Sequence, residues 1–273
     1  MSIDSGIARK RRAIVHLILP LTIMLALVAC KDKPIKPRKT VALIVFVQSD
    51  LKMNKDSDYG IFKSIRDEKI AEAVKQNIKE CPEITSVEIR PLGFNTIVAD
   101  DFANIDQLGP DYDYDKKTKI EQLLLNFVGK YGQYLDASTD NNCQDIVGAY
   151  YFLKGSQDRY SKYDEIRVVF ISDMIHYLST LDDYDLNTDN ITFKSLACLE
   201  AFKRQIEGGK IKTKSGYVDM QKLYKGKNFI VSVIKPSLSG ERASNNETRT
   251  YDINDLWKEF FTKIGATEVK MNM

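Results

Sequence analysis

The sequence predicts an α/β fold in which a doubly wound, mostly parallel sheet carries helices on both faces. Three apolar segments of strand length predict central strands, because a strand buried on both faces has no polar side. They cover 40–47, 165–171 and 228–234. Amphipathic helical segments alternate with these strands, which is the pattern of parallel strands joined by crossover helices.

The predicted domain begins with a strand, a helix and a second strand. The strand covers 40–47, TVALIVFV, which is apolar after its first residue. Apolar residues at helical spacing predict a helix over 67–81, and Pro82 ends it. The second strand, over 86–94, contains Pro91, so we expect it to end early or to lie near an edge.

Two helices and a central strand are predicted next. An apolar face defines a helix over 116–134. A second apolar face defines a helix over 144–154, with two of its tyrosines directed inward. The strand that follows covers 165–171, EIRVVFI, and is typical of a buried parallel strand.

The last part of the chain contains a helix, a strand and a helix. The first helix covers 195–207 and is ended by two consecutive glycines. The strand covers 228–234, NFIVSVI. The final helix covers 252–264, and Asp252 or Asn254 is its candidate N-cap residue.

The first 29 residues differ in character from the rest of the chain. A basic cluster at Arg9–Arg12 precedes an uncharged segment over 13–29, an order that is typical of a secretory signal. The sequence Leu27-Val28-Ala29-Cys30 resembles the lipobox of bacterial lipoproteins, in which a small residue precedes an invariant cysteine. The resemblance implies cleavage before Cys30 and attachment of lipid to its sulfur and its new amino group.

We therefore expect three parts: a signal peptide over 1–29 that is removed, a lipidated tether over 30–39 and a single α/β domain over 40–273. Several acyl chains would hold the protein firmly to a bacterial membrane. Lys31 follows the cysteine, and under the enterobacterial sorting rule it favours the outer membrane, with the domain facing the periplasm or the cell surface. A plain membrane anchor with an accidental cysteine is the alternative.

The net charge of the expected mature chain is close to zero. The whole sequence has 40 basic and 38 acidic residues, and removal of residues 1–29 leaves 36 basic and 37 acidic residues. A near-neutral domain has no global positive field to attract a polyanion. We therefore expect no nucleic acid partner.

A segment in the middle of the chain resembles a known family. The sequence VVFISDMIHY, 168–177, resembles the fourth strand and the following loop of von Willebrand factor A domains, which are also called integrin I-like domains. That family has Asp-x-Ser-x-Ser after its first strand, a Thr in a loop before a helix, and an Asp after its fourth strand. Together these residues form a metal-ion-dependent adhesion site. The order of predicted elements agrees with the family over 40–266.

The resemblance implies candidate ligands for Mg²⁺, which prefers octahedral coordination by oxygen. The matching positions are Ser49, Thr139 and Asp173, while Asp50 and Asp140 are adjacent carboxylates. These residues follow predicted strands or precede a predicted helix, at the sheet edge where doubly wound folds bind ligands.

The first-strand motif departs from the family pattern. When the chain is aligned on Ser49, Val47 stands in place of the leading Asp and Leu51 in place of the last Ser. Shifting by one residue places Asp50 in the middle of the motif and restores neither flank. Two interpretations remain open: a divalent ion at these residues, or a degenerate site at which Asp173 only caps the next segment.

Two acidic loops have the alternating spacing that begins a calcium loop. They are 111–115, DYDYD, and 181–190, LDDYDLNTDN, and neither has the closing Glu of a calcium site. Their tyrosines also suit a protein interface, because Tyr provides contact area at a small entropy cost. We therefore assign Asp173, Tyr177 and Tyr184 as candidate partner-binding residues.

The sequence favours a non-enzymatic domain that binds or scaffolds another envelope protein, for instance in a surface or secretion assembly. The expected binding face consists of the loops 48–59, 135–142 and 172–190, whose acidic character favours a basic partner. The alternative is a metal-dependent hydrolase that uses Asp173 and His176. The sequence has no nucleophile elbow, phosphate-binding glycine loop or zinc-ligand spacing to favour the enzyme.

Three cysteines remain after Cys30. The predicted topology separates Cys81 from Cys143, whereas a disulfide between Cys143 and Cys198 is compatible with it. Three buried free thiols are the other arrangement that we expect, since free Cys behaves as a small core hydrophobe.

Overall fold

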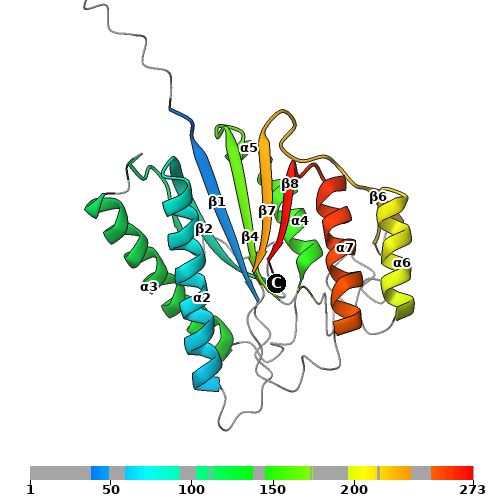
Figure 1. Cartoon of the computed structure of the whole chain (residues 1–273), viewed down its shortest axis with the longest axis horizontal. Coiled ribbons are helices and arrows are strands. Elements are labelled where there is room, and N and C mark those ends of the chain that lie inside the picture. The colour runs from blue at the N-terminus through cyan, green and yellow to red at the C-terminus, as the bar shows by residue number, and fades with distance from the viewer. Residues whose placement is uncertain are drawn as a thin grey trace, which may run out of the picture. The chain divides into compact units, whose positions relative to one another are not determined.

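The computed structural model describes residues 38–48, 59–92, 103–109, 111, 113–137, 145–172, 174, 196–213, 216–234 and 247–272. Lys39–Met273 forms one compact unit. At the centre of its described part is a six-stranded sheet with the order β3-β2-β1-β4-β7-β8 (Figure 1). The strands are β1 (Val41–Gln48), β2 (Ile84–Leu92), β3 (Ala103–Ile105), β4 (Glu165–Ile171), β7 (Asn228–Ile234) and β8 (Glu268–Asn272).

The helices are α2 (Tyr59–Glu80), α3 (Tyr114–Ala137), α4 (Ile146–Gly155), α5 (Gln157–Tyr160), α6 (Leu196–Glu207) and α7 (Glu247–Lys263). A separate two-stranded antiparallel sheet consists of β5 (Lys210–Thr213) and β6 (Gly216–Asp219).

The central sheet is mostly parallel, as predicted. β1 pairs in parallel with β2 on one side and with β4 on the other, and β4, β7 and β8 continue the parallel pairing. Only β3 is antiparallel, along three residues of β2. The chain adds β2 on one side of β1 and then crosses to add β4 on the other side, so the direction of winding reverses between β1 and β4. This arrangement is compatible with a doubly wound α/β fold.

Helices cover both faces of the sheet, because the strand side chains alternate between two apolar cores. Val41, Leu43, Val45 and Val47 of β1 belong to the core under α2 and α3. Ala42, Ile44 and Phe46 belong to the core under α4, α6 and α7. All seven side chains are fully buried, and each contributes about 1–3 kcal/mol of hydrophobic stabilisation. The run of apolar residues in β1 is thus explained by burial on both faces.

The core on the α4, α6 and α7 side is rich in aromatic rings. Trp257 lies 5.3 Å from Phe260 and 5.9 Å from Phe261, measured between ring centroids. Phe202 of α6 packs 5.5 Å from Trp257, and Tyr150 of α4 packs 5.8 Å from Phe260. These contacts between α4, α6 and α7 fix the helices to each other as well as to the sheet.

Some element boundaries differ from the prediction. α2 begins at Tyr59, eight residues before the predicted start. α7 begins at Glu247, so Asp252 and Asn254 lie inside the helix and the N-cap prediction was wrong. The polar residues of its first turns concealed the start of α7, because the prediction took the first apolar periodicity as the beginning.

β2 continues through Pro91 to Leu92. Pro91 is tolerated because β3 pairs with β2 only between Val87 and Ile89, so the described sheet requires no hydrogen bond from Pro91 on that side. The described helices include none that is long and apolar enough to cross a membrane.

Candidate functional site

The carboxyl ends of β1 and β4 lie side by side at the reversal of the sheet. Val47 is opposite Ile171, the last residue of β4. In sequence, Ser49 and Asp50 directly follow β1, and Asp173 follows Ser172 just beyond β4. In open α/β sheets this is the position where ligands bind.

The amino end of α4 lies at the same edge of the sheet. Phe152 of α4 contacts Phe46 near the end of β1, with 5.9 Å between ring centroids, and lies under the Arg90 guanidinium at 3.9 Å. Asp145 is seven residues earlier, which is roughly 10 Å along a helix that runs antiparallel to the strands. The start of α4 therefore extends beyond the strand ends.

The sequence-predicted site residues lie outside the described part of the chain. This holds for the candidate ligands, the candidate partner-binding residues, the alternative catalytic histidine and the lipidation site, namely Ser49, Asp50, Thr139, Asp140, Asp173, His176, Tyr177, Tyr184 and Cys30. What the structure describes is the strand ends and the helix start that adjoin them.

Asp145 is a buried carboxyl at this edge that sequence reasoning did not single out. It is the N-cap of α4, where its Oδ1 accepts a hydrogen bond from the Gly148 N–H at 2.6 Å. The side chain has no exposed surface, and its Oδ2 has no hydrogen-bond partner among the described residues. Burial raises the pKa of Asp145 to about 7, against the opposing effect of the Gly148 N–H. This carboxyl therefore changes charge near neutral pH.

Gly148 allows the Asp145 carboxylate to fold over the first turn of α4. A Cβ atom at this position would lie 2.0 Å from Asp145 Oδ2 and 2.4 Å from its carboxyl carbon. No side chain other than hydrogen fits there while Asp145 keeps its place. This contact explains why a glycine occurs in the first turn of α4.

Tyr151 is a second buried polar group near Asp145. Its hydroxyl has no hydrogen-bond partner among the described residues. Burial, and after it the neighbouring Tyr150 and Asp145, raises the pKa of Tyr151 to about 12. Tyr150 differs, because its hydroxyl accepts the Gln221 N–H at 3.0 Å. The first turns of α4 thus contain two buried polar atoms that no described residue satisfies.

The residues on either side of Asp173 in sequence, Ser172 and Met174, are held by hydrogen bonds. Ser172 is buried, and its Oγ accepts the Met174 N–H at 2.8 Å. Met174 has a φ of 63°, a left-handed conformation that is uncommon for a residue other than glycine. Its carbonyl accepts a hydrogen bond from Trp257 Nε1 at 2.8 Å. Backbone strain of this kind, maintained by surrounding contacts, is frequent at functional sites.

A buried ion-pair network lies under α4 and α5. Glu88 of β2 accepts hydrogen bonds from Arg90 at 2.5 Å and from the Tyr160 hydroxyl, and pairs with Arg159 at 3.1 Å. Burial, and after it Glu88, raises the pKa of Tyr160. Because Glu88 is surrounded by donors, we assign this network a structural role.

The acidic 111–115 loop does not collect its carboxylates around one point. Asp113 caps α3, where its Oδ1 accepts the Lys116 N–H at 2.9 Å, and Asp115 pairs with Lys119 at 2.6 Å. Within the described ranges, no group of three or more His, Cys, Asp or Glu side chains could hold a metal ion. Tyr114 is 84% exposed, and the 181–190 loop lies outside the described residues.

Cys81 is a free, buried cysteine, and burial raises the pKa of its thiol. This agrees with the expectation of a buried free thiol at this position. Cys143 and the side chain of Cys198 lie outside the described part of the chain.

No protein-family model matches this sequence, and no curated protein sequence is significantly similar to it.

Proposed function

We propose that this chain is a lipoprotein, anchored to the bacterial envelope through lipid on Cys30, whose von Willebrand factor A-like domain binds another envelope protein and has no enzymatic activity. The anchor rests on the order of basic cluster, apolar segment and lipobox in the first 30 residues. The membrane is the outer membrane, in keeping with Lys31. The domain would recruit or scaffold its partner at the carboxyl edge of the sheet.

The observation that supports the proposed binding face is the fixed position of the two residues that flank Asp173 in sequence. Met174 donates its N–H to Ser172 and accepts a hydrogen bond from Trp257, at the reversal of the sheet. Flanking residues that are already fixed lose little conformational entropy when a partner binds, which favours affinity. A metal ion at Ser49, Asp50, Thr139, Asp140 and Asp173 is compatible with this function and is not required by it.

Capture of the partner in the native envelope, followed by crosslinking and mass spectrometry, tests the proposed binding face. Asp173→Ala is expected to abolish capture, whereas the matched control Glu83→Ala, at the opposite edge next to Cys81, is expected to leave capture unchanged. If Mg²⁺ or a chelator also alters capture by the parent protein, a metal ion bridges the contact. If Glu83→Ala abolishes capture and Asp173→Ala does not, the binding face is assigned wrongly.

Intact-mass analysis tests the lipid anchor. The mature chain is expected to begin at Cys30 and to carry lipid, and Cys30→Ser is expected to abolish both lipidation and retention in the membrane fraction. A Cys30→Ser protein that still carried lipid would contradict the proposal. Turnover of a hydrolase substrate that is lost in His176→Ala would instead establish the enzyme.

A further inference from the structure

The chain enters the compact unit at the amino edge of the sheet, and its first residues are fixed there. Lys39 Nζ donates to Glu165 Oε2 at 2.6 Å. Thr40 donates both its N–H and its Oγ1–H to Asp164 Oδ2, at 2.8 and 3.1 Å. The Asn228 N–H donates to the Asp164 carbonyl at 3.4 Å, which connects the same point to the start of β7. The starts of β1, β4 and β7 therefore lie together (Figure 1).

Three lysines lie in the segment that leads into β7 along this edge. Lys222, Lys225 and Lys227 are its basic side chains, and we name them the basic rim. Lys227 and Lys39 both lower the pKa of Asp164, after the larger effect of the Thr40 hydrogen bonds, so the rim adjoins the first residues of the domain. Lys222 and Lys225 are exposed. Within the described part of the chain, none of the three lysines forms an ion pair with a carboxylate.

The backbone that carries the basic rim is held by several other elements. The Gln221 N–H donates to the Tyr150 hydroxyl at 3.0 Å, and the Leu223 N–H donates to the Ile264 carbonyl at 2.7 Å. Tyr224 is buried, adopts a left-handed φ of 47° and donates its hydroxyl to the Leu153 carbonyl at 3.2 Å. The three lysines therefore extend from a fixed backbone, which preserves their arrangement when they bind a surface.

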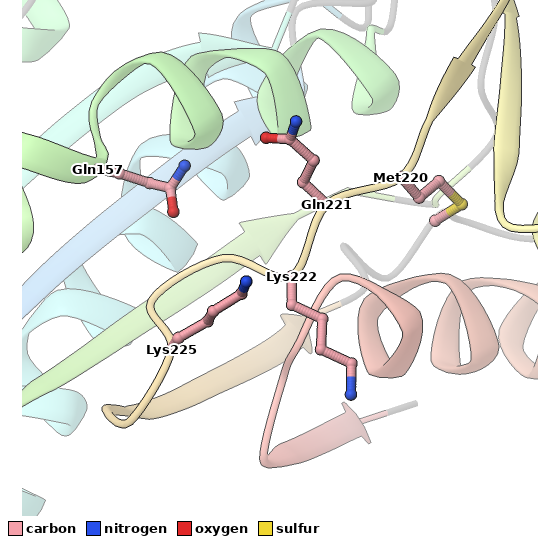
Figure 2. Close-up of a pocket in the computed structure, with 5 residues that line it drawn as sticks. All are labelled: Gln157, Met220, Gln221, Lys222 and Lys225. Carbon is pink, nitrogen blue, oxygen red and sulfur yellow. The ribbon is translucent and has the colours of Figure 1, made fainter.

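The basic rim borders a shallow cavity of about 610 Å³, lined by Gln157, Met220, Gln221, Lys222 and Lys225. Figure 2 shows Gln157 and Lys225 on either side of this hollow, whereas the Lys222 side chain is directed away from it, toward α7. Ammonium groups and side-chain amides are donors for phosphate oxygens. A hollow with donors on two sides can accept an anionic head group, while the outlying lysines contact its neighbours.

The basic rim is concentrated over the β4 and β7 half of the amino edge, together with the exposed Lys162. At the other half, the end of α2 and the start of α3 carry both signs of charge: Glu80, Asp111 and Asp113 lie there with Lys79 and Lys117, all exposed. An anionic surface would attract the rim more than this mixed half, so it would favour a tilt that brings the rim closer to it.

We propose that the basic rim rests on anionic phospholipid head groups of the membrane that holds Cys30; this inference depends on the proposed lipid anchor. The tether over 30–39 is short, about 35 Å at full extension, and it joins the domain beside the rim. Each lysine close to an anionic membrane surface raises the equilibrium constant for docking of the domain by about fivefold at low salt. Three lysines together therefore raise this constant by roughly a hundredfold. In that orientation the carboxyl edge of the sheet points away from the membrane, toward a partner.

The test uses the full lipidated protein reconstituted in vesicles, with labelling of lysines by an amine-reactive reagent and peptide mass spectrometry. Vesicles of phosphatidylglycerol and phosphatidylethanolamine are compared with vesicles of phosphatidylcholine alone. We expect labelling of Lys222 and Lys225 to fall by at least about fivefold in the anionic vesicles and to recover in high salt. Lys75 on α2 and Lys130 on α3 are the controls, because their labelling should be the same in both kinds of vesicle. Equal labelling of the rim in both vesicles would overturn the inference.

Three triple variants separate the effect of the basic rim from the effect of total charge. In Lys222→Gln/Lys225→Gln/Lys227→Gln, the neighbouring Lys162 should lose its protection. In Lys75→Gln/Lys130→Gln/Lys203→Gln, which removes three exposed lysines from α2, α3 and α6, protection of the rim should persist. The arginine triple variant at the rim should retain the protection of Lys162, because it keeps the charge. Identical protection of Lys162 in both glutamine triple variants would overturn the inference.

The mass of the Cys30 peptide in the same samples distinguishes the two proposals. If lipid is present and the rim is not protected, the inference fails and the anchor stands. If lipid is absent, both proposals fail, because no membrane then holds Cys30. Protection that occurs in native envelopes but not in protein-free anionic vesicles shows that an acidic protein covers the rim, and also overturns the inference.

Discussion

Trp257 Nε1 donates a hydrogen bond to the carbonyl of Met174 at 2.8 Å, and this bond joins α7 to the turn beyond β4. Both residues are fully buried, so the carbonyl has no access to water as a replacement partner. The left-handed Met174, next to Asp173 in sequence, is therefore supported from α7 by the Trp257 side chain.

Trp257→Phe is expected to destabilise the fold by about 1–3 kcal/mol, because it leaves the buried Met174 carbonyl without this donor. The measurement is the midpoint of urea unfolding, together with partner capture, which should weaken more than stability alone explains. Phe261→Leu is the control, since it disturbs the same aromatic core but keeps the Trp257 hydrogen bond. Equal loss of capture in both variants at matched stability would contradict a positioning role for this bond.

Asp145 should make stability depend on pH. Its pKa is about 7 in the folded protein and about 3.9 in the unfolded chain, so the folded state binds more protons between these values. The resulting stabilisation is complete below about pH 4 and is lost as the pH rises through 7, with an upper limit of about 4 kcal/mol.

Asp145→Asn keeps an N-cap acceptor for the Gly148 N–H but cannot ionise. We expect its free energy of unfolding to lack the decrease with rising pH that Asp145 causes, and to exceed that of the parent protein at pH 8. Urea unfolding at intervals from pH 4 to 8 is the measurement. Parallel curves for the two proteins would show that Asp145 titrates normally.

Gly148→Ala is expected to destabilise the protein, although alanine is normally favoured over glycine in a helix by about 0.5–1 kcal/mol. The reason is the 2.0 Å approach of the new Cβ to Asp145 Oδ2. Gly129→Ala on α3 is the matched control, because a Cβ there meets no atom within 4 Å, and it should be neutral or stabilising.

A double-mutant cycle isolates this contact. In an Asp145→Ala background the clash is absent, so Gly148→Ala should become neutral or stabilising. If Gly148→Ala were equally destabilising in that background, its effect would not come from the contact with Asp145.

Lys116→Met should destabilise the protein by about 3 kcal/mol, because it removes a buried donor from several carbonyls at once. Lys116 Nζ donates to the carbonyls of Pro82 and Ile84 at 2.6 Å and of Gly109 at 2.9 Å, which holds the start of α3 against β2. Burial lowers the pKa of this lysine. Lys75→Met, at an exposed position of α2, is the control and should change stability by less than about 0.5 kcal/mol. Similar losses in both variants would contradict the structural role.

The parts of the fold that could be predicted from sequence are those whose pattern is local. The strand 165–171 was predicted with its observed bounds, because burial on both faces leaves an apolar segment that ends sharply. β3 has three residues and β8 lies at an edge, so neither contains enough apolar residues to stand out. The hairpin of β5 and β6 is short and polar, and it was missed for the same reason.

Local sequence patterns predict the residues of the candidate site only in part. Asp145 carries a recognisable signal, an Asp before an apolar helical segment, but its burial depends on packing that no local pattern contains. The left-handed conformation of Met174 has no signal in its residue type. Lys116 appears as an ordinary helix-surface lysine in the sequence, and only the positions of three distant carbonyls make it structural.

The central position of β1 has a mechanical consequence for a tethered protein. If a partner bound at the carboxyl edge is pulled away from the membrane, tension enters at Lys39 and runs along β1. β2 and β4 flank this strand in parallel along its length, so the load acts in shear on two ladders of hydrogen bonds at once. Bonds loaded together resist rupture better than bonds that open one after another. In the proposed lipoprotein, the first residues of the domain, fixed by Glu165 and Asp164, would thus form a force-bearing joint between membrane and partner.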